Sequence, residues 1–158
     1  RDLRMSRGLG DVYKRQADIV TKYWAVGALK GTIGIPVIED FFHLTYVENS
    51  GVAFGMLENK RIIFITLSVI ILIVLGVYYF KSENKTVWLK LGCALICSGS
   101  VGNLIERITK GYVVDFLDVR IVNFPVFNVA DIAVCVGAFA LVVHFLFYDG
   151  AKDGEENG

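Results

Sequence analysis

Three long stretches of the chain consist almost entirely of apolar residues. Residues 62–80 contain no Asp, Glu, Lys or Arg, residues 87–105 contain only Lys90, and residues 126–148 contain only Asp131. About 20 apolar residues in a helix are enough to span the hydrocarbon core of a bilayer. Helices of a soluble bundle usually keep a polar face, which residues 62–80 lack. The pattern therefore predicts three transmembrane helices.

A shorter amphipathic segment precedes these stretches. Residues 17–29 read as a helix in which Asp18 and Lys22 share a face. A helix of this length rises only about 20 Å, which is too short to cross a membrane. We interpret it as the outer half of a truncated first transmembrane helix. Residues 1–16 are polar and Arg-rich, and no apolar signal-peptide core follows them. These residues could be a native cytoplasmic tail or a non-native leader joined to the chain, and we favour the non-native leader.

The pattern changes between the first two helices, over residues 31–60. Glycines and Pro36 interrupt the helical pattern, and residues 41–47 are rich in aromatic and β-branched side chains. Turn-forming residues follow, and residues 52–57 can return as a second strand. A small extracytoplasmic β element is therefore predicted between the first and second helices.

The remaining segments are connections and a tail. A longer polar loop covers residues 106–125, and Pro125 marks the entry to the fourth helix. Residues 149–158 are acidic and are expected to be disordered. The fold class is therefore mainly α: a polytopic membrane protein with four transmembrane helices and one membrane domain over residues 17–148.

Composition narrows the function classes. Hydrophobic residues make up 54% of the chain, and the mean hydropathy is +0.55. The formal net charge is zero, so the charge does not indicate binding to nucleic acid. Basic residues lie on both sides of the predicted helices, so charge does not fix the orientation. The three cysteines lie inside apolar stretches without a CxxC or Cys/His cluster, so neither a metal nor another cofactor is expected.

Asp131 is the first candidate for chemistry. An ionisable group in the middle of a membrane helix costs roughly 2.5–3.5 kcal/mol, so its presence suggests a function. The predicted helix places Asp131 about two turns from its start, near one membrane surface. Asn128 precedes it by three positions and shares its face.

Asp115 is expected to lie close to Asp131. The third and fourth helices are joined by one loop, which carries Asp115, so both acids reach the same side of the membrane. Two close carboxylates tend to share one proton. One can then act as a general base toward water and the other as a general acid. No Ser or Cys nucleophile has an evident histidine partner, because His43 and His144 lie far apart in the predicted layout.

Five short motifs, in order, carry a resemblance to a known family. They are Asp18-Ile-Val-Thr-Lys22, Asn49-Ser-Gly-Val-Ala-Phe-Gly55, Gly102-Asn-Leu-Ile-Glu-Arg107, Val114-Asp-Phe116 and Phe127-Asn-Val-Ala-Asp131. Their order and spacing resemble the signature blocks of the lipoprotein signal peptidases (signal peptidase II). The resemblance covers roughly residues 17–148.

The resemblance implies a bacterial, monomeric enzyme of the cytoplasmic membrane, with both termini cytoplasmic and its active site near the outer leaflet. Its partners would be membrane lipid and a prolipoprotein, cut before a diacylglyceryl-modified cysteine. Asp115 and Asp131 would be the catalytic dyad. The other matching positions would bind substrate or support the site: Asp18, Lys22, Asn49, Gly51, Ala53, Asn103, Arg107, Asn128 and Ala130. Glu106 departs from the family, which usually has Asp there.

Two other functions remain open from the residues alone. A small transporter or channel subunit could line an ion path with Asp131 and Arg107, and it would show flux without cleavage. A non-catalytic membrane scaffold could bind a partner through the β element, and it would tolerate neutralisation of both aspartates. The shared side of Asp115 and Asp131 favours the peptidase.

Overall fold

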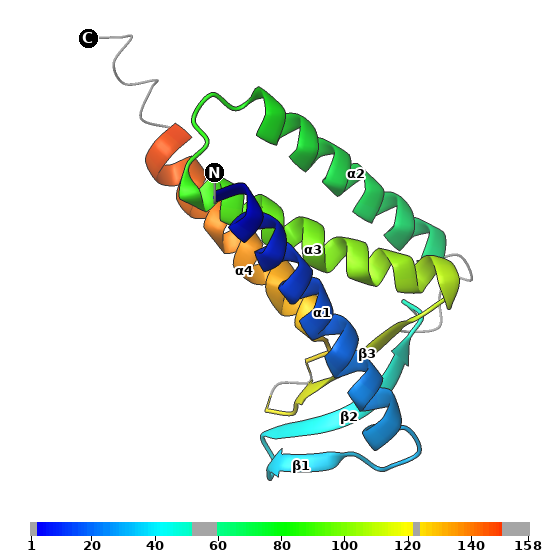
Figure 1. Cartoon of the computed structure of the whole chain (residues 1–158). Helices are drawn as coiled ribbons and strands as arrows, with labels where there is room; N and C mark the ends of the chain where they lie inside the picture. The colour runs from blue at the N-terminus through cyan, green and yellow to red at the C-terminus, as the bar shows by residue number, and fades with distance from the viewer. Residues whose placement is uncertain (1–2, 52–59, 122–123, 150–158) are drawn as a thin grey trace.

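The computed structural model describes residues 3–51, 60–121 and 124–149. Over these residues a helical bundle stands on a small sheet at one of its ends (Figure 1). In chain order the elements are α1 (Leu3–Leu29), β1 (Ile35–Ile38), β2 (Phe42–Asn49), α2 (Lys60–Lys81), α3 (Val87–Thr109), β3 (Val113–Val119), α4 (Val129–His144) and the π-helical turn η1 (Phe145–Asp149).

Three helices in the described part of the chain are long and apolar enough to cross a membrane. These segments are Arg61–Lys81, Val87–Thr109 and Val129–Tyr148. Only 6% of the first is buried, so α2 turns apolar side chains outward on nearly every side, as a lipid-facing helix does. The mainly helical class with a small sheet is confirmed. Because α1 is not among the three, a fourth span stays a prediction.

The sheet contains two strands that sequence analysis did not predict, β1 and β3. Its order is β1-β2-β3, with both pairs antiparallel, and β3 comes from the segment predicted to be the 106–125 loop. The prediction was wrong there because the partner of β3, the strand β2, lies far away in sequence. Pro36 lies in β1 at the sheet edge, where a residue without an N–H is tolerated. The predicted strand at residues 52–57 falls outside the described residues.

Helix boundaries also differ from the predictions. Helix α1 begins at Leu3, so the segment interpreted as a leader is helical and continuous with residues 17–29. Whether that leader is native stays a prediction. Helix α3 continues to Thr109 and carries residues that we had assigned to the loop. Helix α4 begins at Val129 rather than 126, because the side chain of Asn128 caps it.

Glycines allow α3 and α4 to pack closely along their length (Figure 1). A Cβ atom on Gly92 would lie 2.9 Å from the Gly137 carbonyl oxygen, and a Cβ on Gly137 would lie 2.9 Å from that of Gly92. A Cβ on Gly99 would collide with the Ala130 backbone. Small residues let membrane helices approach in this way. The C-terminal half of α3 is thereby held against the start of α4.

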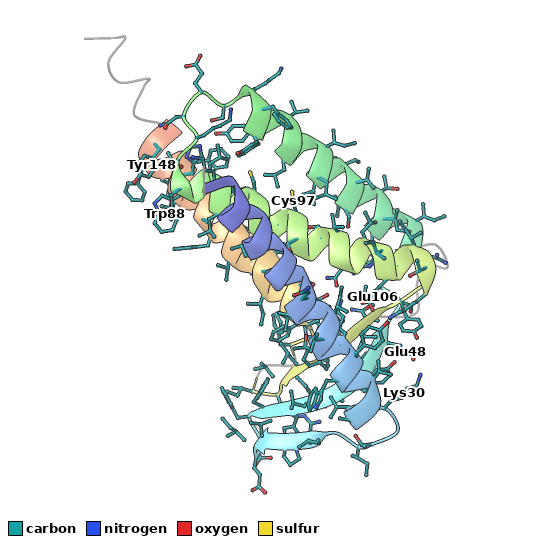
Figure 2. All side chains as sticks on the ribbon, in the orientation of Figure 1. Lys30, Glu48, Trp88, Cys97, Glu106 and Tyr148 are labelled. Atoms are coloured by element: carbon teal, nitrogen blue, oxygen red, sulfur yellow. The ribbon has the colours of Figure 1, made fainter. Side chains whose placement is uncertain are left out.

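Helix α1 packs across one face of the sheet. Ala25 and Leu29 are fully buried against Val114 and Phe116 of β3. Successive residues of a strand point to opposite faces, so Asp115 points away from the α1 face. The sheet end of the bundle includes Lys30 and Glu48, while Trp88 and Tyr148 lie at the other end (Figure 2). The acids of interest are therefore brought together where the helices meet the sheet.

Candidate active site

Asp131 lies in the first turn of α4 and is part of a capping box. The Asp131 N–H donates to Asn128 Oδ1 at 3.0 Å, and Asp131 Oδ2 accepts from the Asn128 N–H at 3.0 Å. The predicted depth of two turns was wrong, because the helix starts three residues later than predicted. A carboxylate at a helix N-terminus is stabilised by the unpaired N–H groups and by the helix dipole.

Asp115 lies on β3 rather than on a loop, which corrects the prediction for residues 106–125. It pairs with Val47 of β2, and only 2% of its surface is exposed. Strand pairing fixes its backbone, and burial fixes its side chain. Asp131 is more accessible, with an intermediate exposure. The two acids therefore occupy unequal surroundings.

Asn49 and Asn128 bind the two oxygens of Asp115. Asn49 Nδ2 donates to Asp115 Oδ2 at 2.8 Å, and Asn128 Nδ2 donates to Asp115 Oδ1 at 2.6 Å. A backbone N–H occupies the amide oxygen of each asparagine. Gly51 N–H donates to Asn49 Oδ1 at 2.9 Å, and Asp131 N–H donates to Asn128 Oδ1. A backbone N–H can only donate, so each amide must present its NH₂ group to Asp115.

Asn103 connects the two acids. Its Nδ2 donates to Asp131 Oδ1 at 2.9 Å, and its Oδ1 accepts from Asn128 Nδ2 at 3.2 Å. Asn128 in turn donates to Asp115, so Asp115 and Asp131 belong to one continuous hydrogen-bond network. Among the described residues, no hydrogen bond joins the two carboxylates directly. Both are held instead by uncharged amide and backbone donors.

A buried ion network supports the site from α1. Lys22 is 4% exposed, and its Nζ lies 3.1 Å from Asp18 Oδ2 and 2.7 Å from Glu106 Oε2. Asp18 Oδ1 accepts from the Ala130 N–H at 3.2 Å, which ties α1 to the start of α4. Ala130 supports the site through its backbone N–H and is itself buried. This explains why the motif includes a residue without a polar side chain.

Glu106 is the supporting residue that sequence analysis left out of the site. It lies near the C-terminal end of α3, beside α1 (Figure 2). Its carboxylate pairs with Lys22 and, through Oε1 at 2.8 Å, with Lys110. Its Oε2 also accepts from the Val114 N–H at 3.4 Å, next to Asp115. A buried lysine needs anionic partners, and this requirement was the available signal for Glu106.

Three predicted site residues remain: Gly51, Arg107 and Ala53. Gly51 orients Asn49 through its N–H, as described above. Arg107 lies with its guanidinium carbon 5.4 Å from the centre of the Phe64 ring, and no hydrogen bond links it to Asp115 or Asp131 in the described part of the chain. A cation over an aromatic face is a favourable contact that joins α3 to α2. Ala53 lies outside the described residues.

Burial raises the pKa of Asp115 from its ordinary value of 3.8 to about 6. The Asn49 and Asn128 amides lower the pKa, and the negative charge of Asp131 raises it. Desolvation disfavours the charged form of an acid, and a neighbouring carboxylate adds to that effect. Burial and the charge of Asp131 therefore both favour the protonated form of Asp115.

This pKa predicts how the stability of the protein changes with pH. The folded chain binds the Asp115 proton more tightly than the unfolded chain, so the contribution to stability is greatest below about pH 4. It is lost as the pH rises through about 6. Asp115→Asn removes this titration. We expect the melting temperature of the variant, relative to wild type, to increase by several degrees between pH 4 and pH 7.5.

Thermal unfolding in one detergent across this pH range is the measurement. Asp118→Asn is the matched control, because Asp118 lies on the same strand and bonds Thr45 and Arg120 instead. A melting-temperature difference for Asp115→Asn that stays constant with pH would contradict the raised pKa.

A cavity of about 460 Å³ lies beside the ion network, between α1, α3 and the sheet. Lys22 and Glu106 form part of its wall, but Asp115 and Asp131 do not line it. We therefore do not assign this cavity to chemistry at the two acids. No cluster of three or more His, Cys, Asp or Glu side chains suited to a metal ion occurs within the described residues.

The fold and the site together define a helical membrane protein with a buried acid–amide centre where its helices meet a small sheet. The chain belongs to the signal peptidase II family, because the family model described as signal peptidase (SPase) II matches residues 15–147.

Individual relatives agree over most of their length. The lipoprotein signal peptidase of Clostridioides difficile is 43% identical, with 84% of this chain and 88% of the relative covered. That of Caldanaerobacter subterraneus subsp. tengcongensis is 46% identical, with 85% and 92% covered. A bacterial membrane enzyme solved by the in meso method at 1.9 Å resolution has a TM-score of 0.81 and 31% identity, with 92% of this chain and 96% of that chain covered.

Proposed function

We propose that this protein is an intramembrane aspartic endopeptidase of the bacterial cytoplasmic membrane. It removes the signal peptide from diacylglyceryl-modified prolipoproteins by cutting before the lipidated cysteine. Membership of the signal peptidase II family supports a peptidase, and relatives named lipoprotein signal peptidases support prolipoproteins as substrates. The observation that carries the aspartic mechanism is the network that joins Asp115 to Asp131 through Asn128 and Asn103.

The charges around the two acids favour a shared proton. Lys22 is paired with Asp18 and Glu106, and Lys110 is paired with Glu106. Neither Asp115 nor Asp131 has a cation hydrogen-bonded to it among the described residues. Two carboxylates supported only by neutral donors repel each other, and one added proton removes that repulsion.

A pair with one proton can hydrolyse a peptide bond. Asp131, the more accessible acid at the helix N-terminus, takes a proton from water as the water oxygen attacks the scissile carbonyl carbon. Asp115, whose pKa is raised by burial, donates its proton to the carbonyl oxygen. Asp131 then passes its proton to the leaving amine as the C–N bond breaks, and Asp115 takes back a proton from a hydroxyl of the tetrahedral intermediate as the carbonyl re-forms. The pair thus returns to its starting state with one proton.

The placement of the acids suits a substrate held in a membrane. They lie where three apolar helices meet the sheet, so a lipid-anchored peptide would reach them by diffusion in two dimensions. The sheet would serve as a cradle over the substrate, with the active site near the outer leaflet. Both acids and the asparagines that bind them come from one chain, which is consistent with a monomer.

The substrate assignment predicts a requirement for lipid. We expect the purified protein to cut a diacylglyceryl-modified prolipoprotein and to leave the same precursor intact when its cysteine carries no lipid. The lipid places the scissile bond at the depth of Asp131, and without it the peptide is not concentrated at the membrane. The measurement is the size of the product in detergent or in liposomes, with equal amounts of both precursors.

The matched control is the lipid-modified precursor incubated with the Asp131→Asn protein, which accounts for contaminating peptidases. Comparable cleavage of the modified and unmodified precursors by the unsubstituted protein would refute the lipid requirement. Absence of cleavage of the modified precursor would refute the proposed function itself.

A further inference from the structure

Asn103 lies between a buried cation and one of the two acids. Its Oδ1 accepts a hydrogen bond from Lys22 Nζ at 2.8 Å, and its Nδ2 donates to Asp131 Oδ1 at 2.9 Å. The contact with Lys22 crosses from α1 to α3, and the contact with Asp131 crosses from α3 to α4. One amide side chain therefore connects three helices.

The orientation of this amide depends on Lys22. An ammonium group has three donors and no acceptor, so the oxygen of Asn103 has to face it. The NH₂ group then faces Asp131. In the reversed orientation the amide nitrogen would face Lys22 and the amide oxygen would face a carboxylate, and both contacts would be repulsive. Asn128 also donates to Asn103 Oδ1, but from 3.2 Å and without a charge.

We propose that Lys22 is a positioning residue for hydrolysis: its ammonium group holds the Asn103 amide in the orientation that donates to Asp131 and so keeps Asp131 in the form that accepts a proton from water. This inference rests on the proposed function and adds a role for a residue remote from the scissile bond. The charged groups connected to Asp131 are Lys22 on α1, through Asn103, and Asp115 on β3, through Asn103 and Asn128. Lys22 is paired in turn with Asp18 and Glu106.

The hydrogen-bond inventory of Lys22 supports this role. Its three N–H groups have three acceptors: Asp18 Oδ2, Glu106 Oε2 and Asn103 Oδ1. Asp18 and Glu106 balance the charges of Lys22 and Lys110, and these pairs are sufficient to hold a buried lysine in place. The third bond adds nothing to charge balance, but it is the one that leads to Asp131. A merely structural lysine would not need to face that amide.

The experiment separates this role from simple structural support. Lys22→Met alone would leave both Asp18 and Glu106 without this cation, so it is combined with Glu106→Gln, and Asp18 then keeps the hydrogen bond from the Ala130 N–H. The comparison is with Glu106→Gln alone, which keeps the bond from Lys22 to Asn103. Lys30→Met is the matched control, because Lys30 is a half-exposed lysine paired with Glu48 and outside the catalytic machinery. The readouts are kcat and KM for lipidated precursor across pH, with melting temperatures alongside.

We expect the double variant to lose kcat on the order of 100-fold, with little change in KM because Lys22 does not contact substrate. The acidic limb of its kcat profile should move to higher pH. Without Lys22 the amide can turn its oxygen toward Asp131, and that contact requires a proton on Asp131, the wrong form for a base. Glu106→Gln should keep the limb in its wild-type position, and Lys30→Met should match wild type throughout.

Two results would overturn the inference. One is a double variant whose kcat and whose acidic limb of the kcat–pH profile both match wild type. The other is an equal fall of kcat in the double variant and in Glu106→Gln at every pH, which indicates structural support only. If the double variant does not fold, Lys22→Arg and Lys22→Gln replace it. Arg keeps the charge that sets the orientation of the Asn103 amide, so the acidic limb of the kcat profile should stay at its wild-type pH. Gln can present either end of its own amide, so the limb should move to higher pH. Identical limbs in the two variants would also overturn the inference. Failure of the proposed function would instead appear as no cleavage by wild type.

Discussion

Asp131→Asn and Asp115→Asn should each lower cleavage of lipid-modified precursor by about 10²–10⁴-fold, the range that a positioned acid or base contributes. Asparagine keeps the size of the side chain but can neither accept the proton from water nor donate one to the carbonyl oxygen. The double variant should be little worse than either single variant, because in the proposed mechanism the two acids act as one unit that shares a proton. The measurement is kcat/KM with equal amounts of folded, purified protein.

Asp118→Asn is the matched control for the dyad. Asp118 lies on β3 with Asp115, but its carboxylate bonds Thr45 and Arg120. We expect activity close to wild type. All variants should remain in the membrane, because removing a charge from a site at membrane depth does not disfavour insertion. Substantial turnover by Asp131→Asn would refute the dyad and the aspartic mechanism.

Gly99→Ala should damage both stability and activity. An added Cβ would collide with the Ala130 backbone and lie 2.9 Å from Val134 Cγ2, so α3 and α4 would have to separate. Overpacking of this kind costs about 1–3 kcal/mol. Separation also moves Asn103 away from Asp131, and a displacement of about 1 Å can lower kcat on the order of 100-fold. Melting temperature and kcat of the detergent-purified protein are the measurements.

Gly76→Ala provides the same substitution in another membrane helix. A Cβ on Gly76 of α2 would meet nothing within 4 Å, so this variant should keep its activity and its melting temperature. An equal loss in the two variants would mean that the contact between α3 and α4 does not explain it, because Ala has the higher helix propensity at both positions. Wild-type behaviour of Gly99→Ala would mean that the helices do not depend on this close approach.

The sequence by itself determined where the membrane helices lie. Apolar stretches of the required length place a helix in lipid whatever the rest of the fold does, because unpaired backbone groups are too costly there. The chemical types at the site could also be read directly. Asp131 inside an apolar stretch required an explanation, and Asn128 three positions earlier was expected on its face. That Asn128 caps the helix was missed, because the helix was predicted to begin at residue 126.

The tertiary structure alone decided how those residues are connected. Strand β3 forms only because β2 pairs with it across the length of two helices, and no local pattern indicates a partner so distant in sequence. Glu106 joins the site because α1 brings Lys22 to it, and Arg107, on the same helix, contacts Phe64 instead. The orientation of Asn103 is likewise a three-dimensional property, because an amide has two nearly equivalent ends and only the donors and acceptors around it distinguish them.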